Sequence, residues 1–224
     1  MKPKIFIPFR EEADDGFDRN RVEIDGQPLW SMTLDRLKDF NVFIDTNSEE
    51  IFEKIRDDSR FNHVIAHFRD ISLGEAGVSV NDLIRSFLER QGIKHEPVCQ
   101  MHITTPLLKV ETLLSAFQDV EFSSPYDSVV GCTEIQKRMW REDHGSFVPL
   151  NHNPLRLTSS SRLQPVLLEN STFYIFEADT FFKVNNRIGF RPHFYRVPFP
   201  ESLEITSAED ARLANCLIKE SFVQ

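Results

Sequence analysis

The sequence predicts an α/β protein with a doubly wound, mostly parallel β-sheet that is covered by helices. Three observations lead to this fold class. Short apolar segments rich in β-branched and aromatic residues alternate with segments of helical period along residues 1–135. Serine stands at a capping position before several helical segments. The chain has 224 residues, a size that suits one α/β domain with one sizeable core.

The predicted elements follow one another in strand–helix order. Strands are expected at KIFIPF, NVFIDT, HVIAHF, PVCQMHI and YDSVVGCTEI. Helices are expected at PLWSMTLDRLKDF, EEIFEKIRDD, VNDLIRSFLERQ and VETLLSAFQDV, with Ser48 and Ser79 as the N-caps of the second and third. Ligands of such sheets bind beyond the carboxyl ends of the strands, so functional residues are expected just after the strands.

Residues 136–170 break this alternation. They contain hairpin-like turns and polar runs without a helical period, which indicates a small β-rich insertion within a single domain of residues 1–224. The chain then returns to the sheet through FYIFEADTFFKV and places HFYRVPFP near an edge. It ends in the helix SAEDARLANCLIKESF, for which Ser207 is the predicted N-cap.

Charge and composition limit the classes of partner. The 35 acids against 26 bases give a formal charge of −9, which argues against nucleic acid as a partner. The apolar runs are too short for a signal peptide or a membrane span, so we expect a cytoplasmic protein that does not enter a membrane. Cys99, Cys132 and Cys216 lack CxxC spacing, and we expect buried, reduced thiols.

The loop after the first strand is unusually acidic. Such loops often bind phosphate through backbone amides and nearby cations, but here five acids lie between Arg10 and Arg19. A like charge about 4 Å from a phosphate costs on the order of 1–4 kcal/mol, so the loop is expected to repel a triphosphate. Two interpretations remain open: Asp14 or Asp15 recruits Mg²⁺, or the acids form a solvated turn, as charge runs usually do.

Several stretches, in order, resemble the acylneuraminate cytidylyltransferases, also called CMP-sialic acid synthetases. The similar stretches are IPFR, DRNRVEIDGQPL, VFIDTNSEEI, FRD, HITTPLL, YDSVVGCTEI, LENSTFYIF and PESLEITSAEDARLA. Each is short, but together they extend over nearly the whole chain in the family's order. The resemblance implies a Rossmann-like fold of the nucleotide-diphospho-sugar transferase type. It also implies a nucleotidyltransferase that couples CTP to a 2-keto sugar acid, releases pyrophosphate and serves surface-polysaccharide biosynthesis.

The resemblance assigns the nucleotide side of the site to four residues. Arg10 and Arg19 match the family's phosphate-binding cations and are the catalytic candidates, because charge gathers on phosphate oxygens as the bond to pyrophosphate breaks. Asn20 and Arg69 match positions that bind the nucleotide. The alternative for each arginine is a surface salt bridge with a neighbouring acid.

The acceptor side rests on the same resemblance. His102, Thr104 and Thr105 stand where the family places Gln, Thr and Ser against the sugar acid, and an imidazole can hold a carboxylate or hydroxyl. Asn170 and Tyr174 match the Asn and Tyr of the family's NGAIY-type strand, which faces the sugar. For His102 a purely structural role is equally open.

The metal motif departs from the family. Its Asp-x-Asp reads Glu204-Ile205-Thr206 here, so Glu204 is the predicted Mg²⁺ ligand and Thr206 is a poorer one. The family also implies a homodimer formed through the β-rich insertion, with residues 137–162 reaching the neighbouring cleft. Because the opening loop and the metal motif are both altered, a second class remains open: a catalytically silent homologue that binds a sugar or nucleotide as a partner or regulator.

Overall fold

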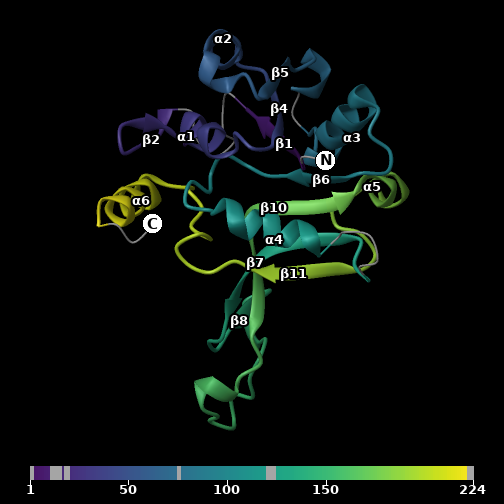
Figure 1. Ribbon diagram of the computed structural model, residues 1–224. Coiled ribbons are helices and arrows are strands. Elements are labelled where there is room, and N and C mark those ends of the chain that lie inside the picture. Colours follow the sequence, from purple (N-terminus) through teal and green to yellow (C-terminus); the bar gives the residue numbers. More distant parts are fainter. Residues whose placement is uncertain (1–2, 11–16, 18–20, 75–76, 120–124, 221–224) are drawn as a thin grey trace.

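The computed structural model of the protein describes residues 3–10, 17, 21–74, 77–119 and 125–220 (Figure 1). Its centre is a seven-stranded sheet in the order β11-β7-β10-β6-β1-β4-β5. The strands are β1 (Lys4–Phe9), β4 (Asn41–Thr46), β5 (Val64–Phe68), β6 (Pro97–Gln100), β7 (Ser128–Ile135), β10 (Val166–Glu177) and β11 (Pro192–Arg196). β10 runs antiparallel to both of its neighbours, and the other pairs are parallel. The predicted mostly parallel sheet is confirmed, with β11 at an edge.

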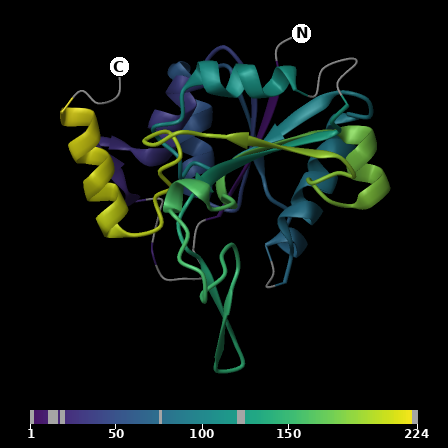
Figure 2. The ribbon, with the colours of Figure 1, turned by 90° about the horizontal axis from the view of Figure 1, so that it is seen from below.

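Helices cover both faces of the sheet. They are α1 (Leu29–Arg36), α2 (Glu49–Asp57), α3 (Val80–Gln91), α4 (Val110–Gln118), α5 (Ala178–Val184) and α6 (Ala208–Lys219). Ile5 and Ile7 point into a core that α1, α2 and α4 complete, whereas Phe6 points into a second core with α3 and α5. Figure 2 shows α4 and α3 on opposite sides of the sheet. The two cores make the fold doubly wound.

The predicted helix caps are confirmed. The Ser48 hydroxyl accepts a hydrogen bond from the Ile51 amide at the start of α2. Ser79 forms a capping box with Asp82 at the start of α3, and Ser207 caps α6. Each cap satisfies an amide that the first helical turn leaves without a backbone partner, so these three helices begin where the sequence predicts.

Short elements complete the fold. β2 (Glu23–Ile24) and β3 (Gln27–Pro28) pair as a hairpin after the opening loop. 3-10 turns occur at Ser59–Phe61, Ile71–Leu73 and Ser160–Arg162. The amide of Asp25, in the β2–β3 turn, donates to the Asn215 side chain at 2.7 Å, so α6 holds this hairpin in place.

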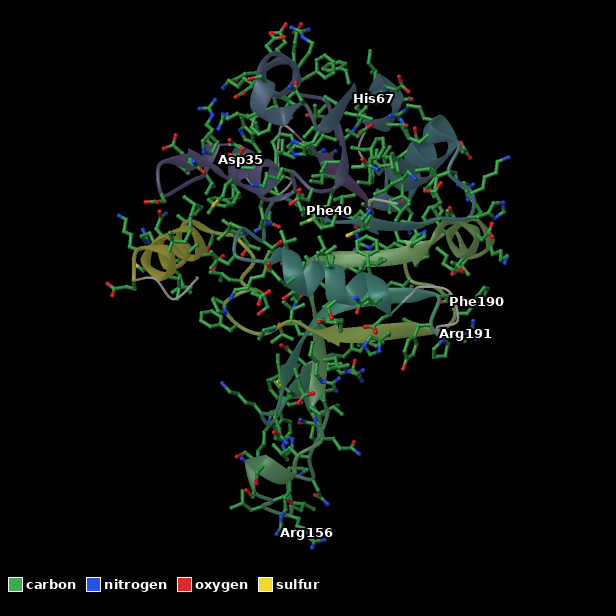
Figure 3. All side chains as sticks on the ribbon, in the orientation of Figure 1. Asp35, Phe40, His67, Arg156, Phe190 and Arg191 are labelled. Atoms are coloured by element: carbon green, nitrogen blue, oxygen red, sulfur yellow. The ribbon has the colours of Figure 1, made fainter. Side chains whose placement is uncertain are left out.

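Residues 136–165 form an arm that projects away from the sheet (Figure 1). Within it, β8 (Trp140–Asp143) and β9 (Ser146–Pro149) pair as a hairpin, and β10 begins at Val166. Arg156 lies at the far end of the arm (Figure 3). The arm occupies most of the predicted insertion, residues 136–170, and its regular strands are limited to that hairpin.

Two remaining expectations concern thiols and membranes. Cys99 and Cys132 are buried and free, as expected, but the expectation is wrong for Cys216, which is exposed on α6. Cys216 lies on the outward side of a helix that has only one fully buried residue, Ala214. Among the helices of the described residues, none has the length and apolar character needed to cross a membrane.

Candidate functional site

Polar side chains gather in two clusters near the carboxyl ends of the central strands. The β4 cluster consists of Asp45, His67, Arg69 and Arg90. The β6 cluster consists of Gln100, His102, Glu169, Tyr174 and Arg187. Side chains two residues apart on a strand point to the same face of the sheet. Asp45 therefore shares a face with Phe43, and Gln100 shares one with Val98. Phe43 and Val98 belong to the core under α3 and α5, so both clusters lie on the α3 side of the sheet.

In the β4 cluster, a buried carboxylate is surrounded by cationic groups. Asp45 is only 2% exposed, and its Oδ1 accepts a hydrogen bond from Nε of Arg69. Nη2 of Arg69 donates to the carbonyls of Phe9 and Asp45, at 3.1 and 2.9 Å. His67 Nδ1 lies 3.0 Å and Arg90 Nη2 3.6 Å from the other oxygen, Oδ2. Arg69 therefore ties the end of β1 to the end of β4.

The predicted nucleotide-side residues meet at this edge only in part. Arg10 is exposed and follows β1 directly, next to the carbonyl that Arg69 holds. Arg19 and Asn20 lie outside the described residues, as do the five acids of the opening loop. For Arg69 the alternative was a salt bridge at the surface. The ion pair that Arg69 forms with Asp45 is buried instead.

In the β6 cluster, Gln100 and Tyr174 stand directly opposite each other on antiparallel strands. The Tyr174 hydroxyl donates to Glu169 Oε2 at 2.9 Å. The Arg187 guanidinium lies over the Tyr174 ring, 3.5 Å from its centroid, and Nη1 donates to Gln100 Oε1 at 2.5 Å. This geometry combines a hydrogen bond to a neutral amide with a cation–π contact.

The position of Arg187 fixes the hydrogen-bonding state of its neighbours. Arginine can only donate, so the oxygen of the Gln100 amide faces Arg187 and the NH₂ group faces His102. Gln100 Nε2 lies 3.2 Å from His102 Nε2, which must therefore accept. In this arrangement His102 is neutral and carries its proton on Nδ1.

Burial shapes the electrostatics of the same cluster. Burial lowers the pKa of Arg187, although Tyr174 and Glu169 act in the opposite direction. Burial also raises the pKa of Tyr174 to about 12, with a further contribution from its hydrogen bond to Glu169 and an opposing one from Arg187. Tyr174 therefore stays protonated at neutral pH and serves Glu169 as a donor.

A tightly bonded loop carries Arg187. The Asp127 carboxylate accepts hydrogen bonds from the amides of Phe190 and Arg191, at 3.1 and 3.0 Å. A Cβ atom on Gly189 would lie 2.3 Å from Asp127 Oδ1, so only glycine fits between the loop and this carboxylate. Figure 3 places Phe190 and Arg191 just before β11. These bonds set the backbone from which Arg187 extends.

The segment that follows β6 brings two other candidates side by side. The Thr104 carbonyl accepts a hydrogen bond from the Ile205 amide at 2.7 Å, and Glu204 is the adjacent residue. The predicted sugar segment and metal ligand therefore lie next to each other. Within the described residues, the buried hydroxyls of Thr104 and Thr105 have no hydrogen-bond partner.

Buried polar contacts hold this segment at its other end. Arg36 Nη1 donates to the carbonyl of Pro106, and burial lowers the pKa of Arg36 to about 10. The Glu201 carboxylate, 7% exposed, accepts a hydrogen bond from the amide of Lys109 at 3.0 Å. Residues 101–109 are thus fixed from two sides.

The Asn170 side chain forms its hydrogen bonds with residues outside the β6 cluster. Its Nδ2 donates to the Thr133 hydroxyl at 3.1 Å, and its Oδ1 accepts from the hydroxyl and the amide of Thr172, at 2.6 and 3.3 Å. The register of β10 shifts between Glu169 and Tyr174. The Asn170 side chain therefore stabilises this irregular stretch of strand.

The donor set for a metal is sparse in the part of the chain that the structure describes. No group of three His, Cys, Asp or Glu side chains there is arranged to hold an ion. Thr206 stands at the second position of the metal motif, and its hydroxyl donates to Asp210 Oδ2 at 2.8 Å. Glu204 provides one carboxylate, so the described residues fit only a Mg²⁺ site that substrate phosphates and water complete.

A cavity of about 380 Å³ lies elsewhere. Its lining includes Leu88, Ile93, Phe182 and the His95–Asp179 pair, whose Nδ1 and Oδ2 are 2.8 Å apart. Residues 92–95 precede β6, so the cavity lies toward the amino ends of the strands. It contains no predicted site residue.

Sequence reasoning missed Gln100, Glu169 and Arg187. Gln100 lies in the predicted strand PVCQMHI two residues before His102, and that spacing on a strand is the signal that could have found it. Arg187 lies in the loop NNRIGF, which matches no motif. The loop joins the cluster only through the fold.

Comparisons with known proteins support the fold. No family model matches the chain, and none of the curated proteins matches it. Among solved structures, 4-diphosphocytidyl-2C-methyl-D-erythritol synthase from Anaerococcus prevotii DSM 20548 is similar, with a TM-score of 0.68, 13% identity and coverage of 97% of this chain and 96% of that one. CMP:2-keto-3-deoxy-manno-octonic acid synthetase in complex with CTP is also similar, with a TM-score of 0.65, 11% identity and coverage of 98% and 99%. The nucleotide-diphospho-sugar transferase-like α/β fold is thereby confirmed.

Proposed function

We propose that the protein is a cytidylyltransferase that couples CTP to a 2-keto sugar acid and releases pyrophosphate. The observation that carries this proposal is the pair of polar clusters on one side of the sheet, both near the carboxyl ends of its strands. In open α/β sheets this edge is where ligands bind. The similar solved structures are named for cytidylyl compounds, and one contains CTP.

The β4 cluster and the opening loop form the nucleotide side of the proposed site. The sugar's anomeric hydroxyl attacks the α-phosphorus of CTP, and the bond to pyrophosphate breaks. Arg10 and Arg19 stabilise the charge that gathers on the phosphate oxygens. Asn20 and Arg69 contact the nucleotide, Arg69 through Nη1, since its Nε and Nη2 already bond within the protein.

The β6 cluster and the segment after it form the acceptor side. His102 offers a neutral imidazole, and Thr104 offers a buried hydroxyl that has no partner in the described residues. Tyr174 lines the site with its ring, while Asn170 supports the strand that carries it. Acceptor and nucleotide then meet across β1 and β6, which are adjacent strands.

Mg²⁺ is part of the proposal, with Glu204 as its ligand from the protein. When bound, the ion neutralises charge on the phosphates of CTP. The bond between the Thr104 carbonyl and the Ile205 amide keeps Glu204 beside the acceptor segment.

The arm supports a second copy of the chain as a partner, so that the protein forms a homodimer. Its exposed apolar side chains are Trp140, Phe147, Val148, Leu150, Leu155 and Leu157. Leu155 and Leu157 are 96% and 90% exposed, an arrangement that favours burial against a second copy. In such a dimer residues 137–162 reach the neighbouring cleft. Sedimentation of Leu155→Asp beside the unaltered protein tests this, with a monomer expected for the variant.

One observation favours a catalytically silent homologue as the second candidate function. The opening loop carries five acids and one glycine between Arg10 and Arg19, where a triphosphate would have to bind. Such a protein would bind a sugar or nucleotide without chemistry and act as a partner or regulator.

Isothermal titration with CTP and Mg²⁺, followed by an assay of pyrophosphate release with a 2-keto sugar acid, separates the two functions. We expect heat of binding and turnover, and at least a tenfold loss of turnover in Arg10→Ala and Arg19→Ala, because each removes a charge-assisted contact. Arg60→Ala is the matched control, since Arg60 is exposed and paired with Asp58. Absence of CTP binding would remove the enzyme, whereas CTP binding without turnover across sugar acids would favour the silent homologue.

A further inference from the structure

We propose that Arg187 is the cation that binds the carboxylate of the acceptor and thereby selects acidic acceptors over neutral ones. This inference rests on the acceptor side of the proposed function and deepens it. It assigns a specificity role to a residue that lies outside every stretch on which the resemblance rests.

The bonding of Arg187 leaves it able to hold an anion. Nη1 donates to Gln100, the guanidinium face rests on Tyr174, and the Tyr174 hydroxyl and the Glu169 carboxylate also act on this cation. Among the ion pairs formed within the described residues, within 4.0 Å, none includes Arg187. Its direct contacts are with a neutral amide and a ring, and the Glu169 carboxylate acts on it without forming an ion pair, so N–H donors of the guanidinium remain for a ligand carboxylate.

The surroundings strengthen such a contact. Arg187 is partly buried, and attraction between opposite charges grows as water is excluded. Stacking on Tyr174 and the bond to Gln100 fix the guanidinium before any ligand arrives, which reduces the ordering cost of binding. The loop is itself fixed, because Asp127 holds the amides of Phe190 and Arg191.

The neighbours of Arg187 suit the rest of a sugar acid. Glu169 accepts one hydrogen bond from Tyr174, and its remaining lone pairs can accept from sugar hydroxyls. His102 and Gln100 lie on the same side and add neutral polar groups to the cluster. A cation beside a carboxylate and neutral polar groups matches a ligand with one acidic group and several hydroxyls.

The test is direct binding without nucleotide. 2-Keto-3-deoxy-manno-octonic acid and its carboxamide are titrated by calorimetry into the full-length protein, and the same pair is repeated with N-acetylneuraminate and its carboxamide. We expect at least one acid to bind about 10- to 100-fold more tightly than its amide, the range of a charge-assisted hydrogen bond. In Arg187→Gln the ratio should fall to about one, and in Arg187→Lys it should be intermediate.

Arg191→Gln is the matched control. Arg191 is an exposed arginine of the same loop, and its backbone amide, which bonds Asp127, is unaffected by the substitution. It should keep the full preference for the acid. Loss of the preference in Arg191→Gln to the same extent as in Arg187→Gln would overturn the proposal, because net charge alone would then explain it.

Other results would also overturn it. These are an unchanged acid-to-amide ratio in Arg187→Gln, no binding of any acid by the unaltered protein, or tighter binding of a polyol phosphate than of either acid.

A CTP titration on each variant keeps the two proposals apart. CTP binding should be the same in Arg187→Gln as in the unaltered protein. Acid selection by Arg187 without any CTP binding would remove the cytidylyltransferase and leave this inference standing. If Arg187→Gln does not fold, Arg187→Lys, which keeps the charge and the cation–π contact, is used instead. A smaller acid-to-amide ratio than in the unaltered protein then supports the proposal, and an unchanged ratio overturns it.

Discussion

Arg69 and Arg187 lie on the same side of one sheet, and their partners differ in charge. Arg69 is 4% exposed and shares Asp45 with His67 and Arg90, and it donates to two backbone carbonyls. Arg187 is less deeply buried and contacts an amide oxygen and an aromatic ring. One guanidinium is paired with a buried carboxylate, whereas the other is influenced by the exposed Glu169 and forms no ion pair among the described residues.

The difference separates structural from recognition roles. A buried ion pair contributes little net stability compared with an apolar pair, but removal of one partner leaves an uncompensated charge. Arg69 therefore acts mainly on the fold, by joining β1 to β4. Arg187 has no buried carboxylate to compensate, so its loss is expected to affect ligand preference more than stability.

The largest expected effect comes from breaking the β4 cluster. Arg69→Met should lower the free energy of unfolding by about 3 kcal/mol, the low end for a buried pair, because His67 and Arg90 still stand near Asp45. Urea denaturation monitored by circular dichroism measures it. Arg60→Met, which removes an exposed partner of Asp58, should leave the free energy of unfolding nearly unchanged, because exposed ion pairs contribute little to stability. Equal losses in the two variants would show that the Arg69–Asp45 pair is not buried in solution.

A somewhat smaller effect is expected at the loop that carries Arg187. Gly189→Ala brings a Cβ atom to 2.3 Å from Asp127 Oδ1, so the loop must move away from its anchor. Overpacking of this kind costs about 1–3 kcal/mol. Urea denaturation should show that loss, and calorimetry should show a smaller preference for sugar acids over their amides. A destabilised protein with an intact preference would mean that Arg187 does not depend on this anchor.

The fold could be predicted from the sequence because its signals are local. The caps at Ser48, Ser79 and Ser207 each depend on residues within one helical turn. The alternation of strands and helices over residues 1–135 was enough to indicate the parallel part of the sheet. The exposure of Cys216 was missed because free cysteines are usually buried, and α6 turns this one outward.

Site residues could be predicted only where they lie in a stretch of sequence that carries a recognisable motif. His102 and Tyr174 stand in stretches that resemble a known family, and the structure brings them into one cluster. Arg187 meets Gln100 across 87 residues of sequence, through a loop with no motif. Glu169, which accepts a hydrogen bond from Tyr174, depends on a register shift in β10 that composition does not reveal. Contacts of this kind arise from tertiary packing, which a single sequence does not encode locally.

The smallest expected effect is spectroscopic, and it tests the comparison between the arginines directly. The folded protein raises the pKa of Tyr174 from its ordinary value of 10.0 to about 12, chiefly through burial. The protonated phenol is therefore favoured in the fold, so this contribution to stability is complete below pH 10 and is lost as pH rises through 12. The Arg187 cation opposes the rise, so Arg187→Gln should move the Tyr174 titration to still higher pH, while Arg69→Gln should leave it in place. Absorbance at the tyrosinate band, taken as the difference from Tyr174→Phe, measures both shifts. A downward shift in Arg187→Gln, or equal shifts in the two variants, would show that the charge of Arg187 is not felt at Tyr174 and that the two arginines do not differ in the way described.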